Sequence, residues 1–155
     1  MKDLSYDEGN SAFQVRVGCI IRKDDKILIQ KESSVDYVSL PGGRVKLMED
    51  AISAGIREIK EELGVKATFK KEIAIIENFF TLAYNNKQYH EILMLIEFTL
   101  DDKSFYEKEV VENLEEDKNI ELLWLDKEGL KEYHIKPDIL TDFNFDDEFK
   151  HYVLK

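Results

Sequence analysis

Three carboxylates recur at close spacing in the segment Pro41–Val65, which reads PGGRVKLMEDAISAGIREIKEELGV. On a helix that turns by about 100° per residue, Glu62 lies about 40° to one side of Glu58, and Glu61 lies about 60° to the other. The three side chains therefore form one acidic patch. Oxygen ligands without His or Cys are the set that Mg²⁺ and Mn²⁺ prefer in proteins. The spacing indicates a site for one of these cations.

A solvated acidic helix face is the alternative interpretation of the same residues. Runs of charge usually have that meaning, and this chain is acidic, with a formal net charge of −11. Against it, like charges at positions i and i+4 weaken a helix by roughly 0.2–0.5 kcal/mol per pair. The glutamates also lie in the C-terminal half of the helix, where the helix dipole disfavours anions. The sequence RExxEE alone still favours the solvated face.

The complete spacing of the segment favours the cation site. Gly43 is followed after five residues by Glu49 and, after seven more, by the run REIKEELGV that begins at Arg57. This pattern resembles the signature of the Nudix (MutT-like) hydrolases, Gx5Ex7REUxEExGU, in which U is an aliphatic residue, and every fixed position matches. The signature covers about a sixth of the chain.

The resemblance implies catalytic and metal-binding roles for these residues. Glu58 and Glu62 are expected to be the principal metal ligands, with Glu61 binding directly or through water. The backbone carbonyl of Gly42 is expected to face the same ion. Arg57 is expected to hold the carboxylates in place through charge-assisted hydrogen bonds.

The resemblance also implies an activity. It is Mg²⁺-dependent hydrolysis, with Mn²⁺ as the alternative cation, of a pyrophosphate bond in a nucleoside diphosphate linked to another moiety. Glu49 is expected to brace the loop before the helix or to bind a metal through water, and the sequence does not locate the general base. A Nudix-like module that senses a nucleotide without hydrolysing it is the alternative. Such modules usually lose carboxylates of the signature, and this chain keeps them all.

Four residues outside the signature are candidates for substrate binding. Arg16 alternates with apolar residues in a strand, so it points either to a binding face or to solvent. Phe80 is placed to stack on a base or to fill the core. Tyr84 lies near the position of a tyrosine in relatives that act on dinucleoside polyphosphates, although the register does not match clearly. Glu91 is a candidate for the additional carboxylate that members of the family recruit after the signature.

Other acidic and basic residues are weaker candidates. Glu97 and the acidic segment 112–117 are further choices for the additional carboxylate, and His90 is expected to be a structural or surface histidine. Relatives that prefer ADP-ribose carry a proline about 15 residues past the signature. No proline occurs between Pro41 and Pro137, which argues against that substrate.

The helix that positions the glutamates is predicted to begin at Glu49-Asp50 and to end at Gly64, which suits a C-cap. Its apolar side is predicted to face the core and comprises Ile52, Ile56, Ile59 and Leu63. Small residues on the acidic side leave room for another group to approach, and these are Ala51, Ala54 and Gly55.

Strands are predicted on both sides of this helix. Phe13–Arg22 and Lys26–Gln30 flank a turn and predict a hairpin, and Asn85-Asn86 marks a second hairpin turn. The later predictions are strands at Val65–Phe80 with an interruption at Lys70–Glu72, at Tyr89–Leu100 and at Asn119–Leu125, a loop at Asp101–Asp117 with a short strand near Glu109–Val111, a short helix after Asp126, a helical piece opened by Pro137, and a C-terminal helix over Phe145–Val153. Residues 1–12 are either a frayed tail or a short edge strand. This order is compatible with the Nudix fold, an α/β (α+β) arrangement in which a mixed β-sheet is sandwiched between α-helices.

Composition limits the remaining possibilities. The length of 155 residues predicts one domain over residues 1–155. The net charge of −11 excludes a basic footprint for nucleic acid. Cys19 is the only cysteine, is expected to be a buried small hydrophobe, and excludes an intrachain disulfide. Without a membrane-length apolar run or a signal-peptide pattern, we expect a cytoplasmic protein whose partner is a small phosphorylated molecule; the resemblance adds a homodimer.

Overall fold

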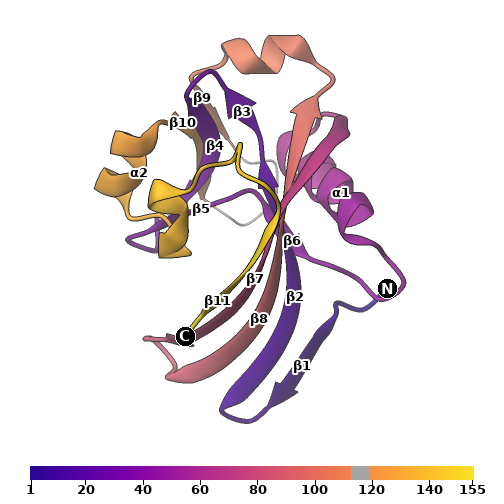
Figure 1. Ribbon diagram of the computed structural model, residues 1–155, viewed down its shortest axis with the longest axis vertical. Coiled ribbons are helices and arrows are strands. Elements are labelled where there is room, and N and C mark those ends of the chain that lie inside the picture. The colour runs from indigo at the N-terminus through magenta and orange to yellow at the C-terminus, as the bar shows by residue number, and fades with distance from the viewer. Residues whose placement is uncertain (113–118) are drawn as a thin grey trace.

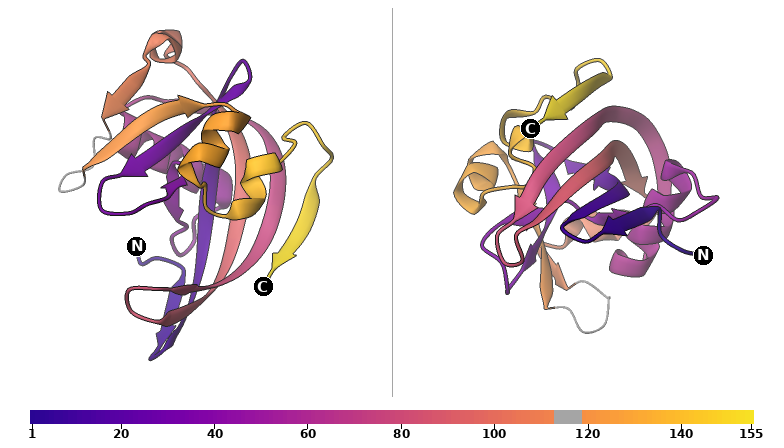
Figure 2. Two further views of the ribbon diagram at one scale, coloured as in Figure 1. Left: turned by 90° about the vertical axis from the view of Figure 1, so that its left-hand side faces the viewer. Right: turned by 90° about the horizontal axis from the view of Figure 1, so that it is seen from below.

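The computed structural model describes residues 1–112 and 119–155. It has the predicted mixed α+β fold, in which the described residues form two β-sheets and two α-helices (Figure 1). Seen from below in Figure 2, α1 (Ala51–Leu63) and α2 (Lys127–Tyr133) lie on opposite sides of the long strands of the larger sheet. The larger sheet is therefore the middle layer. In the described part of the chain, no helix is long and apolar enough to cross a membrane.

The larger sheet has six strands in the order β1-β2-β8-β7-β11, and β6 also pairs with β2. Its strands are β1 (Ser5–Glu8), β2 (Ser11–Ile20), β6 (Gly42–Arg44), β7 (Ala67–Leu82), β8 (Lys87–Leu100) and β11 (Lys150–Leu154). The sheet is mixed, because β2 runs parallel to β8 and β11 parallel to β7, whereas the other pairs are antiparallel. Residues 5–8 form the edge strand that was one of the two alternatives for the N-terminal segment.

The long β7–β8 hairpin confirms the predictions from the sequence. Its turn contains Asn86, which has a left-handed backbone with φ 55°. The interruption expected in the first strand appears as two register shifts, one between Phe69 and Lys71 and one between Glu72 and Ala74. These irregularities let a 16-residue strand curve around the core without ending.

The smaller sheet has five strands in the order β3-β4-β10-β9, and β5 also pairs with β4. Its strands are β3 (Arg22–Lys23), β4 (Lys26–Glu32), β5 (Val38–Ser39), β9 (Val110–Glu112) and β10 (Ile120–Leu125). The sequence predicted that Phe13–Arg22 forms a hairpin with the strand at Lys26–Gln30. This prediction is wrong for most of the segment, since only Arg22 and Lys23 pair with β4. The end of β2 is apolar on both faces, so it is covered by two cores and stays in the larger sheet.

Helix α1 has the predicted ends. The Asp50 side chain accepts a hydrogen bond from the Ser53 N–H at 2.9 Å. At the other end Gly64 has φ 75° and donates its N–H to the Lys60 carbonyl. Both contacts satisfy backbone groups that a helix end leaves without an intrahelical partner.

The face of α1 that packs on the sheet differs from the prediction. Ile52 and Ile56 are only half-buried, whereas Gly55, Glu58 and Glu62 are buried along with Ala54, Ile59 and Leu63. The cause lies at Gly55, where an added Cβ would be 2.3 Å from Cζ of Phe98. The small residues therefore admit this ring, and the acidic side of the helix turns toward the sheet.

The C-terminal part contains short helices and one strand. Asp126 caps α2 as predicted, and the 3₁₀ helix η2 (Asp138–Asp142) follows Pro137. A second 3₁₀ helix, η1 (Lys103–Glu107), precedes β9. The predicted C-terminal helix over Phe145–Val153 is wrong, because residues 150–154 form β11 on the free edge of β7. Half-buried Tyr152 and Leu154 pack against the core at strand spacing, and backbone pairing with β7 outweighs the helical spacing of the aromatic residues.

Two apolar cores lie on the two sides of the larger sheet. One core, which includes Cys19, Ile59 and Phe98, lies between the larger sheet and α1, and the smaller sheet contributes Leu28 and Leu122 to it. The other, which includes Ile76, Leu95 and Leu130, lies between the sheet, the smaller sheet and α2. Together they fix α1 and the turn before β6 against the middle of β2.

Candidate active site

The turn Pro41–Gly43 brings the backbone against the helix carboxylates. Gly42 has φ 144°, and a Cβ there would lie 2.1 Å from the carbonyl oxygen of Val17. A Cβ on Gly43 would lie 2.4 Å from Oε1 of Glu58. Glycine is therefore required at the first position by the backbone and at the second by the carboxylate. The absence of side chains lets Glu58 lie directly against β6.

The three glutamates differ in exposure. Glu58 and Glu62 are only 7% and 3% exposed, whereas Glu61 is exposed. Oε2 of Glu62 accepts a hydrogen bond from the N–H of Gly42 at 3.2 Å. The sequence predicted that the carbonyl of Gly42 faces the cation, and the contact between Gly42 and the carboxylates in the structure is made by its N–H.

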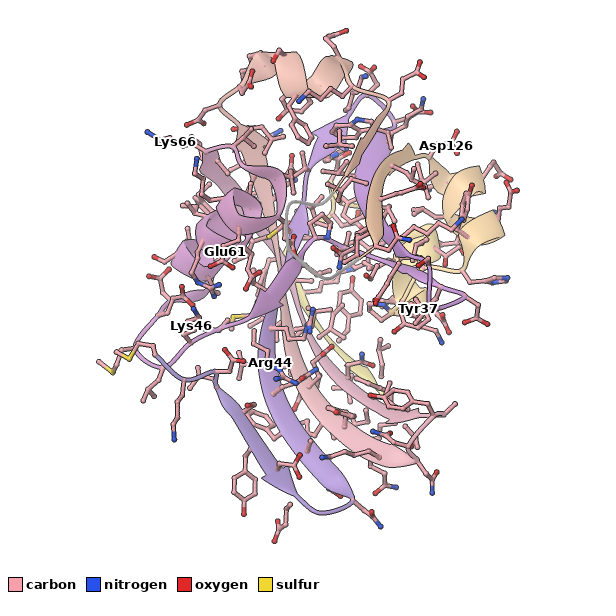
Figure 3. All side chains as sticks on the ribbon, turned by 180° about the vertical axis from the view of Figure 1, so that it is seen from behind. Tyr37, Arg44, Lys46, Glu61, Lys66 and Asp126 are labelled. Carbon is pink, nitrogen blue, oxygen red and sulfur yellow. The ribbon has the colours of Figure 1, made fainter. Side chains whose placement is uncertain are left out.

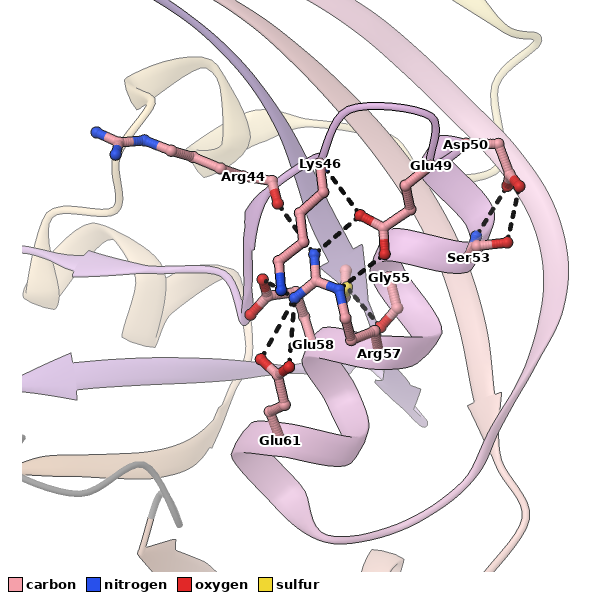
Figure 4. Close-up of polar contacts among 10 residues, drawn as sticks. Arg44, Lys46, Glu49, Asp50, Ser53, Gly55, Arg57, Glu58 and Glu61 are labelled. Carbon is pink, nitrogen blue, oxygen red and sulfur yellow. Dashed lines mark hydrogen bonds and ion pairs between the residues drawn. The ribbon is translucent and has the colours of Figure 1, made fainter. Parts of the chain in front are cut away.

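Arg57 is the centre of the hydrogen-bond network around these acids (Figure 4). Its Nε and Nη2 donate to the two oxygens of Glu49 at 2.7 and 3.0 Å. Its Nη1 donates to Glu58 at 2.8 Å and to Glu61 at 3.3 Å. Nη2 also donates to the carbonyl oxygen of Arg44 at 3.1 Å, so one guanidinium joins the turn, the loop and the helix.

The close packing of these charged groups shifts the pKa values of several side chains. The hydrogen bonds from Arg57 hold the pKa of the Glu49 carboxyl below its usual value, and those from Glu49 raise the pKa of Arg57. Burial raises the pKa of the Cys19 thiol, and the charges of Glu62 and Glu58 raise it further. Four carboxylates, those of Glu49, Glu58, Glu61 and Glu62, thus gather around the Arg57 guanidinium, and the charge of Lys46 also acts on Glu49.

The donor chemistry of the cluster fits a hard divalent cation. It offers several carboxylate oxygens next to a glycine turn that lets the backbone approach them closely. Within residues 1–112 and 119–155, however, no three His, Cys, Asp or Glu side chains are already arranged as a ligand set. The hydrogen bonds from Arg57 and from the Gly42 amide hold the carboxylates in their present positions. Binding a cation requires the glutamates to exchange these contacts.

A row of polar side chains crosses the larger sheet beside this cluster. Gln14, Glu91 and Asn78 are direct partners on the adjacent strands β2, β8 and β7, so they share one face. Nε2 of Gln14 donates to Glu91 at 2.6 Å, and Nδ2 of Asn78 lies 3.4 Å from the same carboxylate. Arg16, two residues along β2, belongs to this face, and its Nε is 3.9 Å from Glu91. Arg44 pairs with Arg16 across β2 and β6.

The predicted substrate-binding residues fall into two groups. Arg16 and Glu91 are brought together on this face. The register places the Tyr89–Phe80 pair one row further along the same face, with the rings stacked at 5.2 Å between centroids. Tyr84, at the tip of the β7–β8 hairpin, is 83% exposed.

The weaker candidates lie elsewhere. Glu97 is buried and paired with Lys70 at 3.1 Å and with Arg22 at 3.7 Å, at the far end of β8. His90 stacks on Phe79 at 4.4 Å between ring centroids, on the opposite face of the sheet from Glu91. In the acidic segment 112–117, residues 113–117 lie outside the described residues.

Several residues of the site were not found from the sequence. Gln14 stands two residues before Arg16, and this spacing on a strand was the signal that they share a face. Arg44 directly follows the glycine turn, which places it beside the cluster, and Figure 3 shows it below the helix that carries Glu61. Burial raises the pKa of Tyr37, which directly precedes β5, and the positive charge of Arg16 lowers it, so the two side chains lie within electrostatic reach of one another.

Comparisons with known proteins identify the family of the chain. A family model described as the NUDIX domain matches residues 12–145. A protein of Bacillus subtilis (strain 168) named "Putative 8-oxo-dGTP diphosphatase" is 36% identical over 58 residues, which are 37% of this chain and 39% of that protein. The match thus spans less than half the length of that relative.

Solved structures show the same fold. A crystal structure of a UDP-X diphosphatase has a TM-score of 0.61 at 20% identity, and the match covers 88% of this chain and 66% of that chain. A crystal structure of a NUDIX hydrolase from Nitrosomonas europaea has a TM-score of 0.62 at 18% identity and covers 91% of this chain and 78% of that one. Since the NUDIX model matches most of the chain, including the complete glutamate signature, the protein belongs to the Nudix family.

Proposed function

We propose that this protein is a Mg²⁺-dependent pyrophosphohydrolase that cleaves the pyrophosphate bond of a nucleoside diphosphate linked to another group. The observation that carries the proposal is the burial of Glu58 and Glu62 against the Gly42-Gly43 turn. Buried carboxylates are costly unless they are paired or bind a cation. The carboxylates of Glu49, Glu58 and Glu61 converge on the Arg57 guanidinium beside this turn, and such a cluster of oxygen donors supports a divalent-cation site.

The residues have separate roles in this proposal. Glu58 and Glu62, joined by Glu61, would hold the cation, and a bound Mg²⁺ supplies neutralisation of phosphate oxygens and acidification of a water molecule. Arg57 fixes the rotamers of Glu49 and Glu58 through its hydrogen bonds to both carboxylates. The exposed carboxylate of Glu61 lies at the open side of the cluster, where substrate arrives.

The substrate class is supported by the relatives and by the sheet face. The Bacillus subtilis relative is named for a nucleoside triphosphate, and the structural relative for a UDP derivative. In this chain, aromatic side chains of the Tyr89–Phe80 pair follow the polar row at a spacing of two strand residues, about 6.6–6.8 Å. Phosphates at the polar end and a base toward the rings fit this order of groups.

Hydrolysis is tested by turnover over a panel of nucleoside triphosphates, nucleotide sugars, ADP-ribose and dinucleoside polyphosphates, with and without Mg²⁺. We expect Mg²⁺-dependent product release from at least one of them, and loss of turnover by at least roughly 100-fold in Glu62→Gln. Glu132→Gln removes an exposed carboxylate on α2 and is the matched control. Tight nucleotide binding without any turnover would instead support the sensing module.

A further inference from the structure

Two arginines stand directly opposite one another in the larger sheet. Arg16 on β2 and Arg44 on β6 are cross-strand partners, so their side chains share one face. Like charges in such positions destabilise a strand pair. In a chain with 33 acidic and 22 basic residues, two positive charges thus stand side by side, each near one carboxylate, that of Glu91 or Asp3. It lies next to the glycine turn of the acidic cluster, because Arg44 follows Gly43.

A buried carboxylate and an amide hold this pair in position. Glu91 is 6% exposed and Gln14 is 5% exposed. Gln14 donates from Nε2 to Glu91 at 2.6 Å, and its Oε1 accepts a hydrogen bond from Nε of Arg44 at 3.1 Å. Because Glu91 is an acceptor, it fixes which end of the Gln14 amide faces Arg44. The chain of contacts therefore runs from a buried charge to an exposed guanidinium.

Among the described residues, contacts reach only a minority of the N–H donors of the two arginines. A guanidinium has five N–H donors. The contacts found among the described residues engage Nε of Arg16, at 3.9 Å from Glu91, and Nε of Arg44, and they add Nη1 of Arg44 at 3.6 Å from Asp3. The Arg44–Asp3 pair is exposed on both sides, 41% and 40%, and such pairs are weak and easily exchanged. The Arg16 side chain is 34% exposed.

We propose that Arg16 and Arg44 form a clamp for a phosphoryl group, and that Gln14 and Glu91 are positioning residues that set its geometry. The inference rests on the proposed function, because it assigns the second phosphate of the same substrate. The acidic cluster with its cation takes one phosphoryl group, and the clamp takes the neighbouring one. Planar, forked donors suit this task, since they bind two phosphate oxygens at once.

Binding of inorganic pyrophosphate in the presence of Mg²⁺, measured by calorimetry, tests the clamp without requiring turnover. We expect wild-type protein to bind it and Arg44→Gln and Arg16→Gln to weaken the affinity at least about 10-fold, with Arg44→Lys intermediate. Lys66→Gln removes an exposed positive charge beyond the end of α1 and should bind as the wild type does (Figure 3). No binding by the wild type, or equal binding by Arg44→Gln, overturns the clamp.

Gln14→Met tests the positioning role, because it keeps the volume and removes the amide. We expect a rise in KM and in the pyrophosphate dissociation constant, with kcat and Mn²⁺ affinity unchanged and folding confirmed by thermal unfolding. A variant that is only less stable, with wild-type KM and pyrophosphate affinity, shows that Gln14 is structural and contradicts the inference. Weakened pyrophosphate binding in Arg44→Gln without hydrolysis of any substrate leaves the clamp standing and refutes the proposed function. Hydrolysis of a substrate by the wild type, with unchanged pyrophosphate binding in Arg44→Gln, supports the proposed function and refutes the clamp.

Discussion

Arg57 and Glu49 form a two-pronged ion pair, with Nε–Oε1 and Nη2–Oε2 distances of 2.7 and 3.0 Å. Glu49 also accepts a hydrogen bond from the backbone N–H of Lys46 at 2.9 Å, so the pair ties the loop to the helix. This contact explains why a glutamate eight residues before Arg57 belongs to the same site as the helix carboxylates. Glu49 therefore orients the Arg57 guanidinium so that its Nη1 can donate to Glu58.

Replacement of Glu49 tests this positioning. In Glu49→Ala, Arg57 loses both of its hydrogen bonds to Glu49 and no longer holds Glu58 in one rotamer. We expect turnover to fall by roughly 10- to 100-fold, mostly through a higher Mg²⁺ requirement, as for other residues that orient metal ligands. Mg²⁺ titrations of activity in Glu49→Ala and Glu132→Ala measure the effect, and identical titrations would show that Glu49 does not orient the site.

Gly43→Ala tests the close approach of the turn to the helix. The added methyl group would lie 2.4 Å from Oε1 of Glu58, so the carboxylate must move. Because a displacement of about 1 Å can cost a factor on the order of 100 in rate, we expect a loss of that size with the fold retained. Gly9→Ala is the control, since a Cβ there meets nothing within 4 Å, although its φ of +64° lowers stability. Full activity in Gly43→Ala would contradict the geometry.

The contact between Gly55 and Phe98 sets the orientation of α1. An added Cβ at Gly55 would lie 2.3 Å from the ring, so Gly55→Ala should lower the free energy of unfolding by about 1–3 kcal/mol through overpacking. Adding Phe98→Leu removes the clash, and we expect the double variant to be less destabilised than the sum of the single variants. Chemical denaturation of the four proteins measures the coupling, and strict additivity would show that the two residues do not determine the packing of α1.

An ion pair that depends on pH joins β3 to the segment before the C-terminal strand β11. Nη1 of Arg22 donates to Asp146 at 2.7 Å and holds the pKa of that carboxyl below its usual value. A lowered pKa stabilises the fold above the unfolded-state pKa of 3.8, and this contribution is lost as the pH falls through the folded-state pKa. We therefore expect Asp146→Asn to have a lower Tm than the wild type at pH 6 and the difference to close below pH 3.8. A difference that is constant with pH would contradict this role.

The sequence predicted the parts of the site that depend on local spacing. Residues close together in the chain determine three of these parts. They are the two ends of α1 at Asp50 and Gly64, the glycine turn, and the convergence of Arg57 with the glutamates. The burial of Glu58 and Glu62 was missed, because it depends on Phe98 packing against Gly55 from a strand more than 40 residues away.

Contacts between strands that are distant in the chain could not be predicted from the sequence either. Arg44 and Gln14 join the site only because β6 and β8 both pair with β2. For the C-terminal segment, the sequence predicted a helix that the structure does not have. Its aromatic residues match a helical period, but the free edge of β7 offers backbone partners to residues 150–154, and an edge position is not encoded in local periodicity.

Titration with Mn²⁺ tests the central claim most directly, because it asks whether the buried glutamates hold a divalent cation, independently of any substrate. The account predicts saturable binding by the wild type and by Glu132→Gln, and loss of that binding in the double variant Glu58→Gln/Glu62→Gln with the fold intact. Equal binding by the double variant, or no saturable binding by the wild type, would contradict it.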